Sequence, residues 1–234
     1  MTRSLFVNEV FRSLQGEGPS TGKPAVFLRL ANCNLACVWC DTRYSWDWNM
    51  YPADQERHEE EPATVARRLL EHLREVPLLV VTGGEPLLQQ PAIVALLENL
   101  RSVLPNLRVE IETNGTIAPS DGICDAIDLF VVSPKLSNSA MPEKRRIRLR
   151  ALKGFPRSKL VLKFVVAKVE DFVEISAIVA AAQVDSRSVW VMPEGTDSET
   201  IVRGMKSLSG PAMDVGYSLS TRLHVLLWGD QRGR

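Results

Sequence analysis

Short β-branched apolar runs alternate with amphipathic segments along most of this chain, and this alternation limits the fold more than any other feature. The runs predicted as strands are 26–30, 78–82, 107–112, 129–133, 160–166, 189–192 and 223–227. The segments predicted as helices, with apolar residues three to four apart, are 64–76, 91–104, 171–184 and 198–208. Such alternation indicates an α/β fold with a parallel sheet and crossover helices. Residues 5–13 predict an extra strand before this sheet, with glycine- and proline-rich turns after it.

Composition narrows the class of protein. The 234 residues, 45% of them hydrophobic, can bury the core of one large domain, so we expect a single domain over residues 1–234. Lysine plus arginine equal aspartate plus glutamate at 28 each, so no global charge attracts nucleic acid or a membrane surface. No apolar run is long enough to span a bilayer, and the amino terminus lacks a secretory-signal pattern. We therefore expect a cytoplasmic protein that acts on a small molecule, with no nucleic-acid or membrane partner.

Three cysteines with CxxxCxxC spacing follow the strand predicted at 26–30. They are Cys33, Cys37 and Cys40. Thiolates are the usual ligands of iron–sulfur clusters. Three ligands from one short loop leave one iron of a four-iron cluster without a protein ligand, and an open position is what a catalytic metal site needs. The spacing therefore predicts a catalytic 4Fe-4S cluster, which requires the reduced thiols of the cytoplasm.

The same cysteines also suit two other uses. Structural zinc prefers four ligands, but the remaining cysteine, Cys124, is distant and has no histidine beside it. A redox pair of Cys37 and Cys40 would leave Cys33 without a role. A non-catalytic zinc or disulfide protein stays open as an alternative, and Cys124 is interpreted as a small buried hydrophobic residue.

Glycine and polar residues follow five of the predicted strands. They lie in the cysteine loop and in the segments 82–86, 112–115, 133–135 and 192–195. If the sheet curls, these strand ends would face one site. Gly83 and Gly84 suit close backbone approach to a ligand, although a tight turn is the simpler use of two glycines.

The cysteine spacing resembles that of the radical S-adenosylmethionine (SAM) enzymes, and a wider set of motifs resembles the 7-carboxy-7-deazaguanine synthase family. The set comprises Leu14-Gln15-Gly16-Glu17-Gly18, Arg29, Cys40-Asp41-Thr42, Thr82-Gly83-Gly84-Glu85-Pro86, Glu112-Thr113-Asn114-Gly115 and Ser133-Pro134-Lys135. The resemblance runs from about Phe6 to the carboxyl terminus. It implies a partial (β/α) barrel of about six parallel strands, the radical SAM core, with an N-terminal strand extension and usually a homodimer.

The resemblance also implies a reaction. An electron from the cluster cleaves S-adenosylmethionine to a 5′-deoxyadenosyl radical, which takes the hydrogen at C6 of 6-carboxy-5,6,7,8-tetrahydropterin. Ring contraction with loss of ammonia then gives 7-carboxy-7-deazaguanine. This carbon–nitrogen lyase step belongs to the biosynthesis of queuosine and other 7-deazapurines.

The resemblance assigns roles to individual residues. Cys33, Cys37 and Cys40 would bind the cluster, and Thr42 would bind Mg²⁺ unless its hydroxyl only closes a polar turn. The residues that would hold S-adenosylmethionine are Gly84, Glu85, Ser133, Pro134, Lys135, Met192, Pro193, Glu194 and Gly195. The residues that would bind the pterin are Leu14, Gln15, Gly16, Arg29 and Thr82, with Arg29 facing its carboxylate. Glu112 either binds the ribose or is a paired carboxylate that closes its strand.

Two regions leave alternatives open. The basic stretch 143–150 is either a docking site for an acidic electron donor such as flavodoxin or the exposed face of a short helix. Residues 224–234 resemble the family's final strand and tail, where His224 has no assigned role. A radical SAM enzyme that activates a glycyl-radical protein remains the alternative function, because it shares the cysteine loop.

Overall fold

The structure, a computed structural model, describes residues 4–234, so the first three residues of the expected domain lie outside it. Within this range one nine-stranded sheet has the order β3-β1-β2-β4-β5-β6-β7-β8-β9. The strands are β1 (Leu5–Leu14), β2 (Pro24–Leu30), β3 (His58–Glu60), β4 (Leu78–Gly83), β5 (Arg108–Thr113), β6 (Leu129–Val132), β7 (Leu160–Val166), β8 (Val189–Pro193) and β9 (Ser218–Leu219). Strands β2 and β4 to β9 pair in parallel, whereas β1 pairs antiparallel with β2 and β3.

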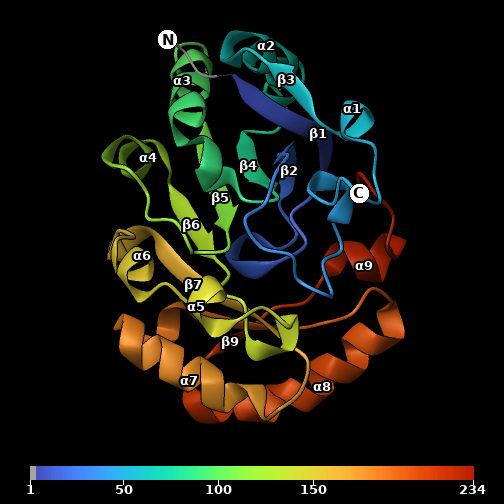
Figure 1. The fold of residues 1–234 in the computed structure, drawn as a ribbon, viewed down its shortest axis with the longest axis vertical. Helices are drawn as coiled ribbons and strands as arrows, with labels where there is room; N and C mark the ends of the chain where they lie inside the picture. Colours follow the sequence, from blue (N-terminus) through green and yellow to red (C-terminus); the bar gives the residue numbers. More distant parts are fainter. Residues whose placement is uncertain (1–3) are drawn as a thin grey trace.

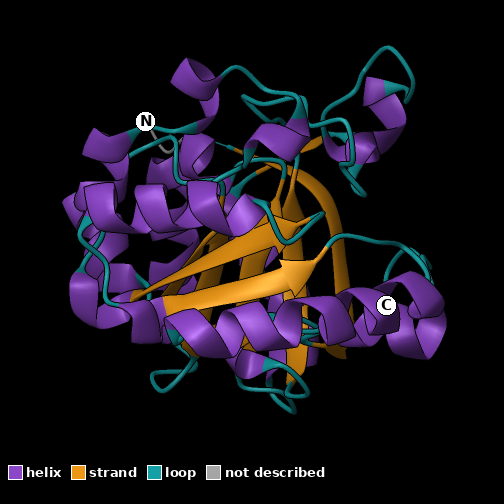
Figure 2. Ribbon diagram, turned by 90° about the horizontal axis from the view of Figure 1, so that it is seen from below, coloured by secondary structure: helices purple, strands orange, loops and turns teal. Residues whose placement is uncertain are grey.

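Nine helices lie between and after the strands in residues 4–234. They are α1 (Ala53–Glu56), α2 (Pro62–Leu73), α3 (Gln90–Arg101), α4 (Asp121–Ala126), α5 (Glu143–Arg146), α6 (Leu149–Lys153), α7 (Asp171–Ala182), α8 (Ser198–Val215) and α9 (Leu223–Trp228). In Figure 1 the longer helices follow one another around the outside of the strands, while α9 and the carboxyl terminus lie on the side that they leave open. Figure 2 shows the strands inside this layer of helices. The expected α/β partial barrel with an N-terminal strand extension is confirmed, and it is open rather than closed. No helix in the described part of the chain is long and apolar enough to cross a membrane.

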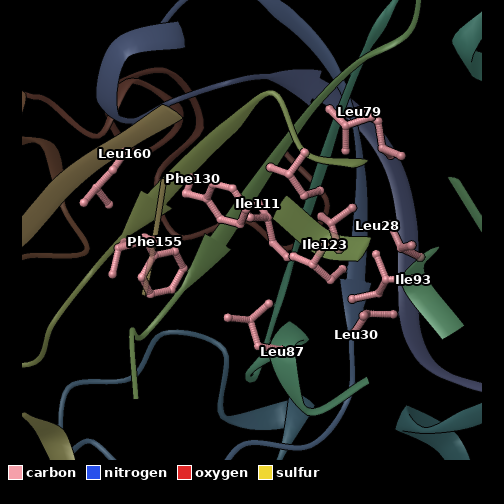
Figure 3. Packing of buried hydrophobic residues seen from close by; sticks show 14 of the residues in the cluster. Leu28, Leu30, Leu79, Leu87, Ile93, Ile111, Ile123, Phe130, Phe155 and Leu160 are labelled. Carbon is pink, nitrogen blue, oxygen red and sulfur yellow. The ribbon is translucent and has the colours of Figure 1, made fainter. Parts of the chain in front are cut away.

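The core lies between the sheet and its helices. Alternate residues of a strand point to opposite faces, so Leu28 and Leu30 of β2 join the large core cluster while Phe27 and Arg29 face the inside of the curved sheet. Figure 3 shows Leu28 and Leu30 packed with residues of β4, β5 and β6 and of the covering helices. The two faces therefore have different tasks, because one holds the fold together and the other lines a cavity.

One predicted strand is wrong. Residues 223–227 form helix α9, and the two-residue strand β9 occupies the final edge of the sheet instead. A short apolar run fits either a buried strand or a helix segment, and here the exposure follows a helix, with Val225 buried and Leu227 exposed. The other predicted strands and helices are confirmed, although α8 continues past 208 to Val215, where Gly216 ends it in a left-handed conformation.

Candidate active site

A cavity of about 500 Å³ opens at the carboxyl ends of the parallel strands, which is within the usual size range of small-molecule sites. It contains 15 of the 18 side chains or glycines that the sequence predicted for the site; Glu85, Pro134 and Pro193 do not line it. The predicted residues that line it are Leu14, Gln15, Gly16, Arg29, Cys33, Cys37, Cys40, Thr42, Thr82, Gly84, Ser133, Lys135, Met192, Glu194 and Gly195. Five strand ends thus meet at one site.

The cysteine loop begins where β2 ends. Asn32 has a positive φ of 75°, and its amide donates to Ser45 O at 2.7 Å, so the chain turns away from the sheet before Cys33. Cys33, Cys37 and Cys40 pack in one small cluster with Leu35 and Met141. All three cysteines are free thiols. The loop therefore presents three thiols to the same cavity.

Burial and a hydrogen bond from an indole define the surroundings of the thiols. Burial raises the pKa of the Cys33 thiol to about 12 and also raises the pKa of Cys37, and metal binding would release their protons. Trp46 donates from Nε1 to Sγ of Cys40 at 3.2 Å. Among residues 4–234 no three His, Cys, Asp or Glu side chains converge closely enough for a single metal ion. Ligands of an iron–sulfur cluster bind different irons and need not converge in that way.

The loop after β4 fits tightly against the cysteine loop. The amide of Gly84 donates to Leu30 O at 2.9 Å, and that of Glu85 to Asn32 O at 2.8 Å. A Cβ on Gly84 would overlap the carbonyl of Asn32. Glycine is therefore required for contact between the two loops, in addition to any ligand.

The side chain of Glu85 bonds to neighbouring loops and does not line the cavity. Its carboxylate is fully buried and accepts hydrogen bonds from Leu87 N (2.9 Å), Thr113 Oγ1 (2.6 Å) and Asn114 N (2.7 Å). Burial outweighs these hydrogen bonds and raises the pKa of Glu85. The side chain thus joins the loops after β4 and β5 and does not face the cavity.

Lys135 and Ser133 follow β6. The ammonium group of Lys135 donates to Ser133 Oγ at 3.1 Å and lies 5.4 Å from the ring centre of Trp39, which belongs to the cysteine loop. An ammonium group at this distance from an indole is attracted by its π electrons. The two residues are therefore positioned beside the thiols and are not solvated surface groups.

Arg29 enters the cavity from β2. Its Nε donates to Glu9 Oε1 at 2.7 Å, and the side chains are only 14% and 15% exposed. Tyr44 donates to the same oxygen at 3.1 Å, and the guanidinium lies 5.8 Å from the ring centre of Tyr44. These contacts use Nε and leave the two terminal nitrogens of Arg29 without a hydrogen bond to residues 4–234.

The carboxylate of Glu112 interacts with three polar side chains that line the cavity. It accepts from Gln15 Nε2 at 3.2 Å and from Thr82 Oγ1 at 2.8 Å, and its carboxylate is 3.7 Å from Lys163 Nζ. The paired-carboxylate interpretation of Glu112 agrees with this arrangement. Gln15 and Thr82 are held by Glu112, which fixes the direction of the amide and the hydroxyl.

A network of buried charges was missed in the sequence. Glu17 pairs with Lys163 and Arg222, and Arg222 also pairs with Asp41 and donates to Gly195 O at 2.6 Å. Burial alone would raise the pKa of Glu17, but the charges of Lys163 and Arg222 hold it well below its ordinary value. His224 lies beside Arg222, and burial lowers its pKa, so its ring is neutral near pH 7.

One signal of this network was present in the sequence. Lys163 lies in the middle of the apolar strand 160–166, where an unpaired lysine is not tolerated in a core. Its position predicts an acidic partner on the inner face of the sheet. No local pattern connects Arg222 to Glu17, since 205 residues separate them.

Comparisons with known proteins agree with the fold and with the cysteine loop described above. Residues 29–200 match the model of the radical SAM superfamily. The chain is 38% identical over 236 residues to a 7-carboxy-7-deazaguanine synthase of Pyrobaculum aerophilum, covering 100% of this chain and 99% of the relative. A protein with the same description from Halobacterium salinarum is 35% identical, over 97% of this chain and 91% of the relative. The crystal structure of QueE from Escherichia coli superposes with a TM-score of 0.71 at 24% identity, covering 94% of this chain and 95% of that one, which shows the shared fold.

Proposed function

The chain belongs to the radical SAM superfamily and, within it, to the 7-carboxy-7-deazaguanine synthase family, and we propose that it converts 6-carboxy-5,6,7,8-tetrahydropterin to 7-carboxy-7-deazaguanine with loss of ammonia. One observation carries the proposal for this chain: the three thiols line the same cavity as Gln15 and Arg29. The site thus combines cluster ligands with groups that suit a flat, polar, carboxylated substrate. A glycyl-radical activase is not favoured, because full-length relatives are described as synthases.

The residues present fit the expected cofactors. Cys33, Cys37 and Cys40 would hold the 4Fe-4S cluster, since they are free, adjacent and turned to the cavity. The residues that would hold S-adenosylmethionine are Gly84, Ser133, Lys135, Met192, Glu194 and Gly195. With both bound, the cluster supplies one-electron cleavage of the sulfonium and hence hydrogen-atom abstraction from the substrate. Glu85, Pro134 and Pro193 would act by shaping the loops.

Arg29 would bind the substrate carboxylate. Its two free terminal nitrogens can make parallel hydrogen bonds to the two carboxylate oxygens, while the bond from Nε to Glu9 fixes the plane of the guanidinium. Gln15, Leu14 and Gly16 would contact the pterin ring, and Thr82 would contribute its hydroxyl oxygen as an acceptor while it donates to Glu112.

Thr42 would contribute one oxygen to Mg²⁺. It lines the cavity, and its Oγ1 lies 3.6 Å from Sγ of Cys40. Mg²⁺ prefers oxygen ligands and often takes one or two from protein and the rest from water and substrate. The support is therefore that Thr42 lines the cavity and that its hydroxyl lies beside the sulfur of Cys40.

The proposal includes four further properties, supported by the family resemblance. The 234 residues would act as one radical SAM domain and form a homodimer. The protein would work in the cytoplasm, where thiols stay reduced. A flavodoxin or similar carrier would supply the electron.

The test is an anaerobic incubation of reconstituted protein with S-adenosylmethionine, dithionite, Mg²⁺ and 6-carboxytetrahydropterin, followed by mass spectrometry. We expect carboxydeazaguanine from the wild type and from Cys124→Ala, whose thiol is outside the cavity. Cys37→Ala should give none. If the wild type carries an intact cluster and forms no carboxydeazaguanine, the proposed function is wrong.

A further inference from the structure

The cysteine sulfurs differ in the hydrogen bonds that reach them. Sγ of Cys40 accepts from Nε1 of Trp46 at 3.2 Å, whereas Sγ of Cys33 accepts from the amide of Leu35 at the longer distance of 3.5 Å. An indole has one N–H group, which donates and cannot accept. Trp46 also lines the cavity together with Cys40. The loop that follows the cysteines thus directs a permanent hydrogen-bond donor at one of the sulfurs.

Hydrogen bonds hold the backbone that carries Trp46. The preceding residue, Ser45, is fully buried and donates from Oγ to Thr42 O at 2.8 Å. The carbonyl of Ser45 accepts from the amide of Asn32 at 2.7 Å. Because Asn32 directly precedes Cys33, the segment with the indole and the segment with the first cysteine share one anchor. The backbone at Trp46 is therefore fixed to the end of β2.

A hydrogen bond to a ligand sulfur changes the ease with which an iron–sulfur cluster takes an electron. Reduction adds one negative charge, part of which resides on the sulfurs, and an N–H donor stabilises that charge. Hydrogen bonds to the sulfurs are accordingly among the factors that set the reduction potential of such clusters. A side chain that only filled space beside Cys40 would act through its ring, which phenylalanine also has. The N–H group of Trp46 is the feature that separates the two roles.

We propose that Trp46 acts through Cys40: its indole N–H donates to the thiolate sulfur and raises the reduction potential of the 4Fe-4S cluster. The inference rests on the proposed function, which assigns this cluster to Cys33, Cys37 and Cys40. On reduction the cluster gains one electron from an external one-electron donor, and no covalent bond to Trp46 forms or breaks. The hydrogen bond lowers the free energy of the reduced cluster relative to the oxidised one.

The test removes the N–H group and keeps an aromatic ring. Trp46→Phe does this, and the matched control is Trp48→Phe, which makes the same change two residues later. Trp48 is also half-buried, but it does not line the cavity and its indole donates no hydrogen bond to residues 4–234. The midpoint potential of each reconstituted protein is measured without S-adenosylmethionine in a redox titration with dyes, followed by visible absorbance. Pulsed EPR of protein labelled with nitrogen-15 in its indole rings detects magnetic coupling between the reduced cluster and Nε1 of Trp46.

At equal ambient potential, the ratio of reduced to oxidised cluster in Trp46→Phe should be about tenfold lower than in the wild type, which corresponds to a midpoint about 59 mV lower for one electron. Iron and sulfide contents should match those of the wild type, and Trp48→Phe should keep the wild-type midpoint. The nitrogen-15 coupling should be present in the wild type and in Trp48→Phe and absent in Trp46→Phe. Equal midpoints in all three proteins would overturn the proposal. If Trp46→Phe takes up too little iron to titrate, the labelled wild type decides, because the coupling supports the proposal and its absence overturns it.

Failure of the proposed function is distinguishable from failure of the role of Trp46. If the wild type carries a cluster that dithionite reduces and no carboxydeazaguanine forms, the function is wrong, and the redox titration still decides the role of Trp46. If the wild type forms carboxydeazaguanine and Trp46→Phe has the wild-type midpoint, only the role of Trp46 is wrong. If the wild type binds no cluster, both are wrong.

Discussion

Arg222 donates from Nε to Oε1 of Glu17 at 3.1 Å, and so joins the segment before α9 to the loop after β1. The same guanidinium pairs with Asp41 beside the cysteine loop. Glu17 and Asp41 lie near the amino end of the chain and Arg222 lies near its carboxyl end, and their side chains meet at the cavity wall. The carboxyl-terminal segment is thereby part of the site and not an appendage to the barrel.

The first prediction concerns this buried pair. Arg222→Ala should lower the free energy of unfolding by about 3–5 kcal/mol, because it leaves the carboxylate of Glu17 largely buried with one cationic partner fewer. Chemical denaturation of the cluster-free protein measures the change. Arg187→Ala removes a pair whose side chains are 88% and 52% exposed, and should leave the denaturation midpoint unchanged. If both substitutions lowered the free energy of unfolding by the same amount, the Arg222 ion pairs would contribute no more stability than an exposed pair.

The second prediction is a pH dependence. Glu17 has a lowered pKa in the folded protein, against an ordinary value of about 4.3 in the unfolded chain. Its ion pairs therefore contribute stability that is complete above about pH 4.3 and is lost as the pH falls toward the folded pKa. The difference in unfolding free energy between the wild type and Glu17→Gln should narrow from pH 5 downward. If the difference in unfolding free energy stays constant from about pH 6 to 3, the pKa of Glu17 is not lowered by its ion pairs.

The third prediction concerns the contact between the two site loops. Gly84→Ala should force the loop after β4 away from Asn32 and thereby move Cys33, so iron incorporation on reconstitution should fall severalfold. Gly210→Ala is the matched control, because a Cβ there has no atom within 4 Å and lies within α8. It should bind iron normally and gain about 0.5–1 kcal/mol of stability. Normal iron content in Gly84→Ala would show that the cysteine loop binds the cluster even when the loop after β4 moves away from it.

The fourth prediction tests the role proposed for Arg29. Arg29→Lys keeps the charge and loses the parallel pair of hydrogen bonds. The dissociation constant for 6-carboxypterin, an unreactive analogue, should rise at least about tenfold, whereas that for pterin without the carboxylate should change by less than about twofold. Calorimetry of the reconstituted protein measures both. Equal losses for both ligands would mean that Arg29 supports the cavity wall through Glu9 and does not bind the carboxylate.

The sequence predicted the strands and the loops at their ends because periodicity and glycine placement are local. It did not decide residues 223–227, because a short, mainly apolar segment fits a strand or a helix, and the structure has helix α9 there and strand β9 at the sheet edge. The cysteine spacing located the thiols, but the direction of the Glu85 side chain depends on Thr113 and Asn114, which belong to another strand end. Motifs thus indicate which loops meet, while long-range hydrogen bonds decide which side chains face the cavity.

The last prediction concerns the tail, residues 230–234, which lines the open side of the cavity. Arg232 donates to both carboxylate oxygens of Glu56 at 2.8 and 2.7 Å, and to Glu9 Oε2 at 3.1 Å, and its guanidinium lies 4.0 Å from the ring centre of Tyr44. Glu9 therefore holds Arg232 with one oxygen and Arg29 with the other. The position of the tail and the orientation of Arg29 in the cavity thus depend on the same carboxylate.

Arg232→Ala should release the tail and raise KM for the pterin severalfold, while stability falls by at most about 1 kcal/mol because the arginine is 43% exposed. Limited proteolysis should cut the carboxyl end of the variant faster than that of the wild type. Arg12→Ala is the control, since Arg12 is similarly exposed at 46% and pairs with Glu75. It should change neither KM nor the proteolysis rate. If Arg232→Ala is cut at the wild-type rate and still raises KM, then Arg232 acts on Arg29 through Glu9 and not by holding the tail closed.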